Sequence, residues 1–350
     1  MNYHYISHVL YQFIYSEPIY RELGGTFLVW RPAVRWKVYR DFRFHTKVGG
    51  RWLSLPRVRL VDRLNLPRLS GVLIANSLYE LGGHRQDGLR TVLMYHGTSD
   101  KIPRASQEVV NQFDYYLLAG PKNEKRLTAA AGIDLDSPRL VRVGNWMFDR
   151  VVNGEYDLDR LRARFGLTDV SRPTILYAPT WAYGGGTLLQ NFDHFVQTIP
   201  REYNLIIRPH YAERHLAPRL ARRIPRKYRK HVMFANSGKP MHHHYIDNLV
   251  IADLLISDTS SMLYEYLITR RPIIISATDS DEVTTSDEGM SVPHVVDHYT
   301  GKEDILRLIR RNLVEQPYRN DLERLLQSCF YFNDGHSTSR CLDFLKHVPV

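Results

Sequence analysis

The chain has 350 residues, of which 43% are hydrophobic and 24% charged, and its formal net charge is +10. This length favours two domains over one, and the composition is typical of a soluble globular protein. We find no run of 18 apolar residues and no signal peptide, which argues against a membrane-spanning helix. The two cysteines, Cys329 and Cys341, form no disulfide or metal-binding pattern, so we expect a cytoplasmic protein with reduced thiols.

Short apolar strands separated by helical stretches make up the first part of the chain. A helix is expected over Val9–Leu23, interrupted near Pro18. Strands are predicted at Tyr3–Ile6, Thr26–Trp30, Gly71–Ala75, Thr91–Tyr95, Tyr115–Leu118 and Leu140–Val143. Strands that alternate with helices indicate a parallel sheet with helices on both faces.

The same alternation begins again after a charged helix expected over Leu158–Phe165. Ser171, Arg172 and Pro173 break this helix, so we place a domain boundary near residue 170, between domains 1–170 and 171–350. Strands are predicted at Thr174–Tyr177, Asn204–Ile207, His231–Phe234, Leu254–Ile256, Ile273–Ile275 and, less clearly, His294–Val296. The expected fold is α/β, with two tandem Rossmann-like, doubly wound domains whose ligand crevices face each other across a cleft. In this arrangement the last helix can pack back on the first domain.

Most of the positive charge lies in residues 21–70, which contain twelve Lys or Arg and three acidic residues. Aromatic residues such as Trp36 are interleaved with these charges. The mixture indicates a surface for an anionic and partly apolar partner, either a membrane interface with anionic lipid or a polyanionic polymer. We find no nucleic-acid-binding motif in this segment. The alternative is an ordinary strand over 34–39 with its basic residues facing the solvent, because apolar and polar residues alternate there.

Polar and glycine residues follow four of the predicted strands. They form HGTSDK (His96–Lys101), APTWAYGGG (Ala178–Gly186), RPH (Arg208–His210) and SDTSS (Ser257–Ser261). Doubly wound folds bind their ligands at the carboxyl ends of the strands. The four turns together therefore indicate one ligand site.

The SDTSS turn lies between a buried strand and a helix that is expected to begin at Met262. Such a turn directs backbone N–H groups and the hydroxyls of Thr259, Ser260 and Ser261 beyond the end of the sheet, which suits phosphate. The alternative is that Asp258, Thr259 and Ser260 only cap the helix.

These motifs, in this order, resemble those of the CDP-glycerol glycerophosphotransferases, the primases and polymerases that build teichoic acid and related capsule polymers. The family's H-G-T-P-L-K corresponds to HGTSDK, L-Y-A-P-T-W-R to LYAPTWA, R-x-H-P or a close relative to RPH, S-D-x-S-S to SDTSS, and D-G-x-A-S to DGHSTS (Asp334–Ser339). The resemblance covers about residues 95–345. It implies the GT-B arrangement of two domains, phosphotransferase activity, and no metal or cofactor.

Some positions depart from the family pattern. Ser99 and Asp100 replace Pro-Leu, Ala182 replaces an arginine, and the family's G-Y-P-R-N-D is replaced by GNWMFD (Gly144–Asp149). The acidic residue on the helix is Glu265. The missing arginine and the altered segment leave the identity of the donor open.

Transfer of glycerol phosphate from CDP-glycerol releases CMP. It needs a base for the acceptor hydroxyl, positive charge or dipoles that stabilise the phosphates, and a pocket for cytidine. The resemblance assigns the base to His96, whose imidazole titrates near neutral pH, and the alternative is a buried structural histidine. Gly97, Thr98 and Lys101 of the same turn are expected on the acceptor side.

Catalytic roles are also expected for His210 and Asp258. Arg208 offers a planar fork for phosphate, and His210 can donate to a diphosphate oxygen or protonate the leaving CMP. Asp258 is assigned to the glycerol hydroxyls or to the orientation of His210. Glu265 is assigned to ribose hydroxyls, with a solvent-facing helix residue as the alternative. The phosphate-binding hydroxyls are expected to be those of Thr180, Thr259, Ser260 and Ser261.

Two further clusters are not expected to bind metal. His242, His243 and His244 are consecutive and cannot share one face of a helix or strand. The carboxylate-rich segment 279–289 lacks the spacing of a calcium loop and is interpreted as a solvated loop.

The expected partners are CDP-glycerol or a related nucleotide-activated donor and a polymer or lipid-linked acceptor, with no nucleic acid. Two other classes stay open, a glycosyltransferase or epimerase that uses a UDP or GDP sugar, and a non-enzymatic binder of anionic lipid or polymer. An acceptor that grows on a lipid carrier would place the protein in the cytoplasm, peripherally on the inner face of the cell membrane.

Overall fold

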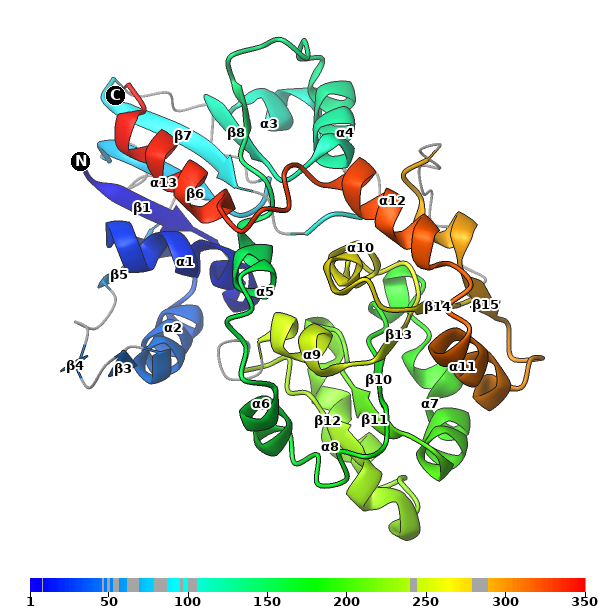
Figure 1. The fold of residues 1–350 in the computed structure, drawn as a ribbon. Helices are drawn as coiled ribbons and strands as arrows, with labels where there is room; N and C mark the ends of the chain where they lie inside the picture. Colours follow the sequence, from blue (N-terminus) through cyan, green and yellow to red (C-terminus); the bar gives the residue numbers. More distant parts are fainter. Residues whose placement is uncertain are drawn as a thin grey trace.

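The fold comes from a computed structural model that describes residues 1–7, 9–45, 47–48, 51–52, 57–61, 69–78, 87–94, 97–99, 106–239, 244–278 and 289–349. Between residues 41 and 52 it describes the backbone alone. Figure 1 shows two groups of parallel strands with helices packed around them.

The first half of the chain forms a seven-stranded sheet in the order β5-β2-β1-β6-β7-β8-β9. Neighbouring strands of this sheet are parallel throughout. Its strands are β1 (Tyr3–Ile6), β2 (Thr26–Val29), β5 (Arg57–Leu60), β6 (Gly71–Ala75), β7 (Leu89–Met94), β8 (Tyr115–Leu118) and β9 (Leu140–Arg142), and a short antiparallel pair, β3 (Lys47–Val48) and β4 (Arg51–Trp52), stands apart.

The second half forms a six-stranded parallel sheet in the order β12-β11-β10-β13-β14-β15. Its strands are β10 (Thr174–Tyr177), β11 (Asn204–Ile207), β12 (Val232–Phe234), β13 (Leu254–Ser257), β14 (Ile273–Ser276) and β15 (Asp297–Tyr299). Every residue of β10, β11, β13 and β14 is buried, as expected for a sheet covered on both faces. The strand order reverses between β10 and β13, and such a switch point is where doubly wound sheets bind ligands.

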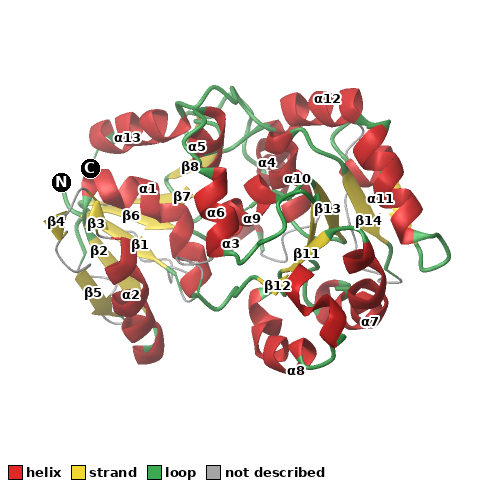
Figure 2. Cartoon of the chain, turned by 60° about the horizontal axis from the view of Figure 1, so that its bottom comes forward, coloured by secondary structure: helices red, strands yellow, loops and turns green. Residues whose placement is uncertain are grey.

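Helices enclose both sheets (Figure 2). Around the first are α1 (Phe13–Leu23), α2 (Pro32–His45), α3 (Gln107–Asn111), α4 (Pro121–Ala131) and α5 (Asp149–Val152), whereas α6 (Leu158–Arg164) packs on α9 (Tyr245–Ile251) of the second half. The remaining helices are α7 (Leu188–Thr198), α8 (Ala217–Ala221), α10 (Met262–Tyr266), α11 (Ile305–Val314), α12 (Arg319–Cys329) and α13 (Ser337–His347).

The end of the chain returns to the first sheet. Helix α13 packs on α1, Tyr3 Oη donates to the carbonyl of Leu345 at 3.2 Å, and the rings of Tyr115 and Phe344 meet edge to face (Figure 1). One apolar cluster also runs through both halves of the molecule and includes Phe13 and Leu249. The two sheets are therefore held in one packed unit, and α12 lies across their junction, where it contacts α4 of the first half and the 3-10 helix Leu267–Thr269 of the second.

Most predicted strands have the observed position, but one predicted strand and one predicted helix interruption are wrong. The prediction of a strand at His294–Val296 is wrong: Val292–Val295 is a 3-10 helix, and β15 begins at Asp297. Pro293 occupies the first turn of that helix, where a missing N–H is tolerated. Pro18 lies inside α1 without ending the helix, so the predicted interruption is also absent.

The basic segment folds differently from the strand alternative. Residues 34–39 belong to α2, which begins at Pro32. Val34 and Val38 are four residues apart and share the inner face of this helix, so Val38 is fully buried while Trp36 is 64% exposed. The i, i+4 spacing of Val34 and Val38 fits a helix, whereas the alternation through Trp36 had suggested a strand, and Pro32 suits the first position of a helix.

Candidate active site

A cavity of about 280 Å³ lies between the two sheets, at the carboxyl ends of their strands. The second half contributes the turns after β10, β11, β12 and β13, and the first half contributes the start of α1 and the turn after β7. The residues that line it include Tyr11, Ile14, Tyr15, Gly97, Ser99, Thr180, Trp181, Arg208, His210, Tyr211, Ser237, Tyr245, Thr259, Ser260, Ser261 and Glu265.

Most of the predicted site residues meet at this cavity. Of the acceptor-side residues, Gly97 lines it, whereas Thr98 is buried and donates from Oγ1 to Asn123 Oδ1 at 2.9 Å. The expected base, His96, and Lys101 lie outside the described residues. The remaining predicted residues on its wall are Thr180, Arg208, His210, Thr259, Ser260, Ser261 and Glu265.

Asp258 lies behind the wall of the cavity. Its Oδ1 accepts from the backbone N–H of Thr180 at 2.8 Å, and its Oδ2 accepts from the N–H and the hydroxyl of Thr187 at 3.0 and 3.1 Å. The carboxylate is buried and bridges the two loops at the switch point. These contacts favour a positioning role for Asp258, which holds the loop after β10 against the turn after β13.

Arg208 and His210 follow β11 and are oriented by different groups. Burial lowers the pKa of Arg208 to about 10, while Asp247, Tyr15, Tyr245 and Glu265 act in the opposite direction. The guanidinium stays charged at neutral pH. His210 Nδ1 accepts from the backbone N–H of Ala212 at 3.2 Å, so the proton of the neutral ring lies on Nε2.

Glu265 is the acidic group of the cavity. It is 1% exposed, and burial raises the pKa of this carboxyl to about 7, against the effect of the Tyr245 and Tyr15 hydroxyls and the Arg208 guanidinium. Tyr15 of the first half donates to Glu265 Oε1 at 3.2 Å and stacks on Tyr245. The solvent-facing alternative for Glu265 is therefore wrong.

Three polar atoms of the cavity lack a hydrogen bond with any residue that the structure describes. They are Ser237 Oγ, Tyr245 Oη and Glu265 Oε2, and all three are buried. Tyr245 is close enough to Glu265 to affect the pKa of its carboxyl, but the two groups do not reach hydrogen-bond geometry. Because buried polar atoms are rarely left unpaired, this set suits a ligand that carries hydroxyl groups.

Two hydroxyls of the turn after β13 form hydrogen bonds within the protein. Ser260 Oγ accepts from the backbone N–H of Met262, the first residue of α10, at 3.3 Å, and Thr259 Oγ1 donates to the carbonyl of Gly184 at 2.6 Å. Gly97 has a φ of +88°, and a Cβ at this position would lie 3.1 Å from both Ser261 Oγ and Glu265 Oε1. The turn after β7 therefore lies against the turn after β13.

Of the departures from the family pattern, Ser99 lines the cavity, whereas Ala182 and the segment GNWMFD lie away from its described wall. Ala182 opens a 3-10 turn, and its N–H donates to Glu213 Oε1 at 3.0 Å. Asp149, the last residue of GNWMFD, accepts from the N–H groups of Ser337 and Thr338 at the start of α13. This segment thus meets the DGHSTS motif, and neither of them lines the cavity.

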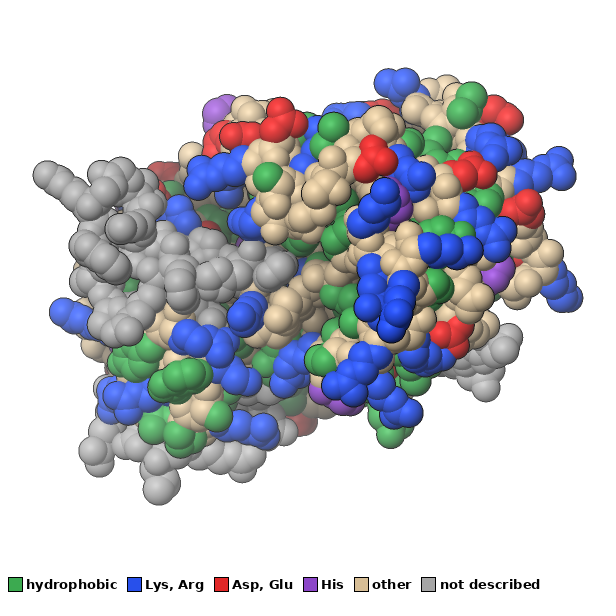
Figure 3. Space-filling model, turned by 90° about the horizontal axis from the view of Figure 1, so that it is seen from below, with side chains coloured by type: hydrophobic (Ala, Val, Ile, Leu, Met, Phe, Trp, Pro, Cys, Tyr) green, Lys and Arg blue, Asp and Glu red, His purple; other side chains and the backbone are tan. Residues whose placement is uncertain are grey.

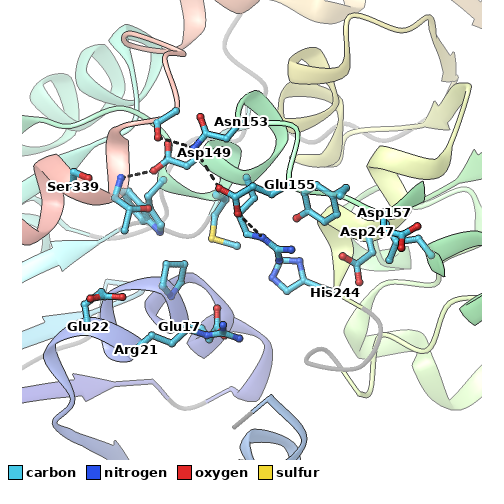
Figure 4. A pocket seen from close by; sticks show the side chains of 18 of the residues that line it. Glu17, Arg21, Glu22, Asp149, Asn153, Glu155, Asp157, His244, Asp247 and Ser339 are labelled. Atoms are coloured by element: carbon cyan, nitrogen blue, oxygen red, sulfur yellow. Dashed lines mark hydrogen bonds and ion pairs between the residues drawn. The ribbon is translucent and has the colours of Figure 1, made fainter. Parts of the chain in front are cut away.

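A larger cavity of about 670 Å³ lies on the other side of α1 (Figure 4). Most of its carboxylates already have partners: Glu17 pairs with Arg21, Asp247 pairs with Arg164, and Asp149 accepts from the start of α13. Three of its arginines, Arg21, Arg150 and Arg164, are paired with carboxylates, which makes the site less suited to a diphosphate. The smaller cavity is therefore the better candidate for the donor.

Sequence reasoning missed the aromatic residues of the cavity. Tyr11 of the first half packs against Tyr211 at a ring distance of 5.3 Å, and Trp181 lies parallel to His210 at 6.2 Å. Tyrosines are frequent in this chain, so no local signal marks these positions.

Among the described residues no three His, Cys, Asp or Glu side chains form a metal-binding group. His242, His243 and residues 279–288 lie outside the described part of the chain.

The family model described as CDP-glycerol:poly(glycerophosphate) glycerophosphotransferase matches residues 76–347. The chain belongs to this family. It is 23% identical over 278 residues to a teichoic acid poly(glycerol phosphate) polymerase of Staphylococcus epidermidis, a match that covers 75% of this chain and 37% of that protein. The chain thus spans little more than a third of that relative.

Solved structures show the fold. A variant of the wall teichoic acid polymerase TagF soaked with CDPG superposes with a TM-score of 0.69 at 18% identity, covering 99% of this chain and 87% of the other. A UDP co-structure of S. aureus MnaA gives a TM-score of 0.63 at 12% identity, covering 99% and 96%. Both matches support the GT-B arrangement of two parallel sheets.

Proposed function

We propose that the protein transfers glycerol phosphate, or a related polyol phosphate, from a CDP-activated donor to a hydroxyl of a polymer or lipid-linked acceptor. The acceptor oxygen attacks the distal phosphorus, the bond from this phosphorus to CMP breaks, and CMP leaves. The observation that carries the proposal is the cavity at the switch point, where Arg208, His210 and the hydroxyls after β13 converge. Family membership favours the CDP-activated donor over the UDP- or GDP-sugar alternative.

The donor site is proposed to lie mainly in residues 171–350. Arg208 binds a phosphate through its fork, and His210 donates from Nε2 to a diphosphate oxygen or protonates CMP. Thr180, Thr259, Ser260 and Ser261 contribute N–H and hydroxyl groups. Ribose hydroxyls bind the unpaired oxygen of Glu265 and the hydroxyl of Tyr245.

Residues 1–170 are proposed to present the acceptor. His96 takes the proton of the acceptor hydroxyl, and Gly97, which lies against Ser261 and Glu265, brings the end of β7 to the donor phosphates. Lys101 supplies positive charge on the same side. The acceptor polymer is a teichoic acid or a related capsule polymer.

A thermal-shift titration tests the donor class. CDP-glycerol or CDP-ribitol is expected to raise the melting temperature more than CMP, and both more than UDP or GDP sugars, because a ligand that binds only the folded state stabilises it. A larger shift with a UDP or GDP sugar would contradict the proposed donor.

Arg208→Ala is expected to weaken the affinity for the CDP-activated donor by about 10- to 100-fold, since a charge-assisted hydrogen bond contributes roughly 1.5–3 kcal/mol. Calorimetric titration measures this affinity. Arg172→Ala is the matched control, because Arg172 is half-buried at the opposite end of the sheet and donates to the carbonyl of Pro200. An equal loss in both variants would place the phosphate contact elsewhere.

Helix α2 is proposed to attach the protein to the inner face of the cell membrane. None of the described helices is long and apolar enough to cross a membrane. Trp36 is exposed on α2, the Arg40 guanidinium lies 5.3 Å from the centre of its ring, and Arg31 and Arg35 are exposed beside it. An aromatic side chain surrounded by arginines suits the interface of an anionic leaflet.

The triple variant Arg31→Gln/Arg35→Gln/Trp36→Ala is expected to lose most of its co-sedimentation with anionic vesicles, because each arginine contributes about 1 kcal/mol near an anionic surface. Binding of the unaltered protein should also weaken as salt rises. Phe332→Ala is the control, since Phe332 is an exposed aromatic under Arg340 in the second half. Equal sedimentation of the unaltered protein with neutral and anionic vesicles would refute this attachment.

A further inference from the structure

A second basic surface lies in the second half of the chain, outside the segment 21–70. Residues 214–230 contain six Arg and two Lys and no Asp or Glu. They form the end of the 3-10 helix Tyr211–Leu216, helix α8, and the start of the 3-10 helix Arg226–His231. Leu220 and Ile224 are buried beneath them, so the segment is anchored to the sheet by its apolar residues while its charged residues face outward.

Almost all of these cations point to solvent without a compensating charge. The exposed ones are Arg219, Arg222, Arg223, Arg226, Lys227, Arg229 and Lys230. Within the described part of the chain only Arg223 forms an ion pair, with Asp193. Figure 3, which views the underside of Figure 1 where α8 lies, shows Lys and Arg side chains gathered on this face. A surface with so many uncompensated charges attracts polyanions.

This surface begins at the wall of the candidate active site. Tyr211 lines the cavity, and the Arg214 guanidinium lies 4.1 Å from the centre of the Tyr211 ring and donates to the Tyr211 carbonyl. From Arg214 the chain continues through α8 to Arg226–His231, which precedes β12 and so lies toward the opposite end of the sheet. The positive charges therefore form a continuous track that leads away from the cavity.

We propose that this track, the basic residues of 214–230, binds a flexible phosphate-rich polyanion, namely the polymeric acceptor of the transfer reaction. The inference rests on the proposed function for the identity of the polymer. Binding along the track would hold the chain so that its end reaches the cavity, where the hydroxyl reacts. Arginine predominates in the track, and its planar fork binds phosphate through two hydrogen bonds.

The composition of the track favours a polymer over a membrane. No large apolar side chain is exposed among the described residues 214–230, in contrast to Trp36 on α2. A membrane-binding surface usually combines basic residues with apolar ones that insert between the lipids. A hydrophilic phosphate polymer needs only the positive charges.

The test is equilibrium binding of a fluorescent oligo(glycerol phosphate) to the full chain, followed by anisotropy over a range of salt concentrations. The variant Arg222→Gln/Arg226→Gln/Arg229→Gln/Lys230→Gln is expected to bind at least about 10-fold more weakly at low salt. The slope of log affinity against log salt is expected to fall by about 3, since each neutralised phosphate contributes about 0.7 for a single-stranded polyanion.

A second variant loses the same charge elsewhere on the surface. It carries Lys302→Gln, Arg307→Gln, Arg319→Gln and Lys346→Gln, four exposed positions outside the track. This control is expected to keep the affinity and the slope of the unaltered chain. If both variants lost affinity equally, net charge alone would explain binding and the track would be refuted.

Anionic vesicles separate the polymer from the membrane. The track variant is expected to sediment with them as the unaltered chain does; loss of vesicle binding with unchanged oligomer binding would overturn the proposal. The binding assay contains no nucleotide donor. Oligomer binding that depends on the track, together with a failed donor titration, would therefore reject the proposed reaction and leave the surface standing.

Discussion

His96→Ala is expected to lower the rate of transfer by about 100-fold or more while leaving donor affinity nearly unchanged. A positioned general base contributes roughly 10²- to 10⁴-fold to a rate, and its loss affects the chemical step rather than ground-state binding. His96 itself lies outside the described residues. The next residue, Gly97, lies against Ser261 and Glu265 of the second half, which places the turn after β7 at the donor site.

Single-turnover kinetics with saturating donor, combined with calorimetric donor binding, measure the two quantities separately. His294→Ala is a suitable control because His294 is exposed on a 3-10 helix and does not line the cavity. Transfer by His96→Ala at the rate of the unaltered enzyme would exclude His96 as the base. A parallel loss of donor affinity and rate would instead indicate that His96 shapes the donor site.

The sequence predicted the sheets well because their strands are buried on both faces. β10, β11, β13 and β14 each contain three consecutive apolar residues next to a polar one, as is typical of strands in a parallel sheet covered on both faces. β15 was misplaced because its residues, Asp297–Tyr299, are mostly polar and form the edge of the sheet. Edge strands carry a weaker apolar signal than central ones.

The candidate site was predictable where residues follow strands. In a parallel sheet the carboxyl ends meet at one edge, so Thr180, Arg208 and Ser260 had to approach each other once the strands were assigned. The role of Asp258 was less predictable. Its carboxylate holds the loop that contains Thr180 and Thr187, a contact set by tertiary packing and not by any local pattern.

The contribution of α1 was not predictable from the sequence. Tyr15 reaches Glu265 only because α1 of the first half packs against the second half, and the sequence does not state how two domains are oriented.

The basic track was missed for a different reason. The net charge of 21–70 almost equals that of the whole chain, so the eight Lys and Arg residues of 214–230, which are offset in the total by acidic residues elsewhere, did not stand out.

Glu265 illustrates the conflict between stability and function in this cavity. The buried Glu265 carboxylate, one oxygen of which has no hydrogen bond with a described residue, destabilises the folded chain when it is ionised, and the nearby Arg208 offsets only part of this effect. The same oxygen is available to a ligand. Residues that bind ligands often reduce stability in this way, and substitution then raises stability while function declines.

Glu265→Gln is accordingly expected to raise the free energy of unfolding at pH 8 by about 3 kcal/mol, because the pKa of Glu265 is raised from 4.5 to about 7 and each unit corresponds to about 1.4 kcal/mol. Below pH 4.5 the carboxyl is protonated in both the folded and the unfolded chain, so the burial cost is absent. Between about 4.5 and 7 the unfolded chain releases the proton and the folded chain keeps it, so stability falls as pH rises. The advantage of the variant should therefore be full above pH 7 and vanish below about 4.5.

Urea unfolding at a series of pH values measures this difference, and Glu124→Gln provides a control of opposite sign. Burial acts to raise the pKa of Glu124, but its hydrogen bonds with Arg142 and Tyr331 outweigh burial and lower it, so the ionised carboxyl stabilises the fold above the unfolded pKa. Glu124→Gln is thus expected to destabilise the chain at neutral pH. A Glu265→Gln variant that is less stable at pH 8, or equally stable at every pH, would show that the carboxylate is compensated in the folded state. A stabilised variant with weakened donor binding would support the proposal that the unpaired oxygen of Glu265 binds the donor.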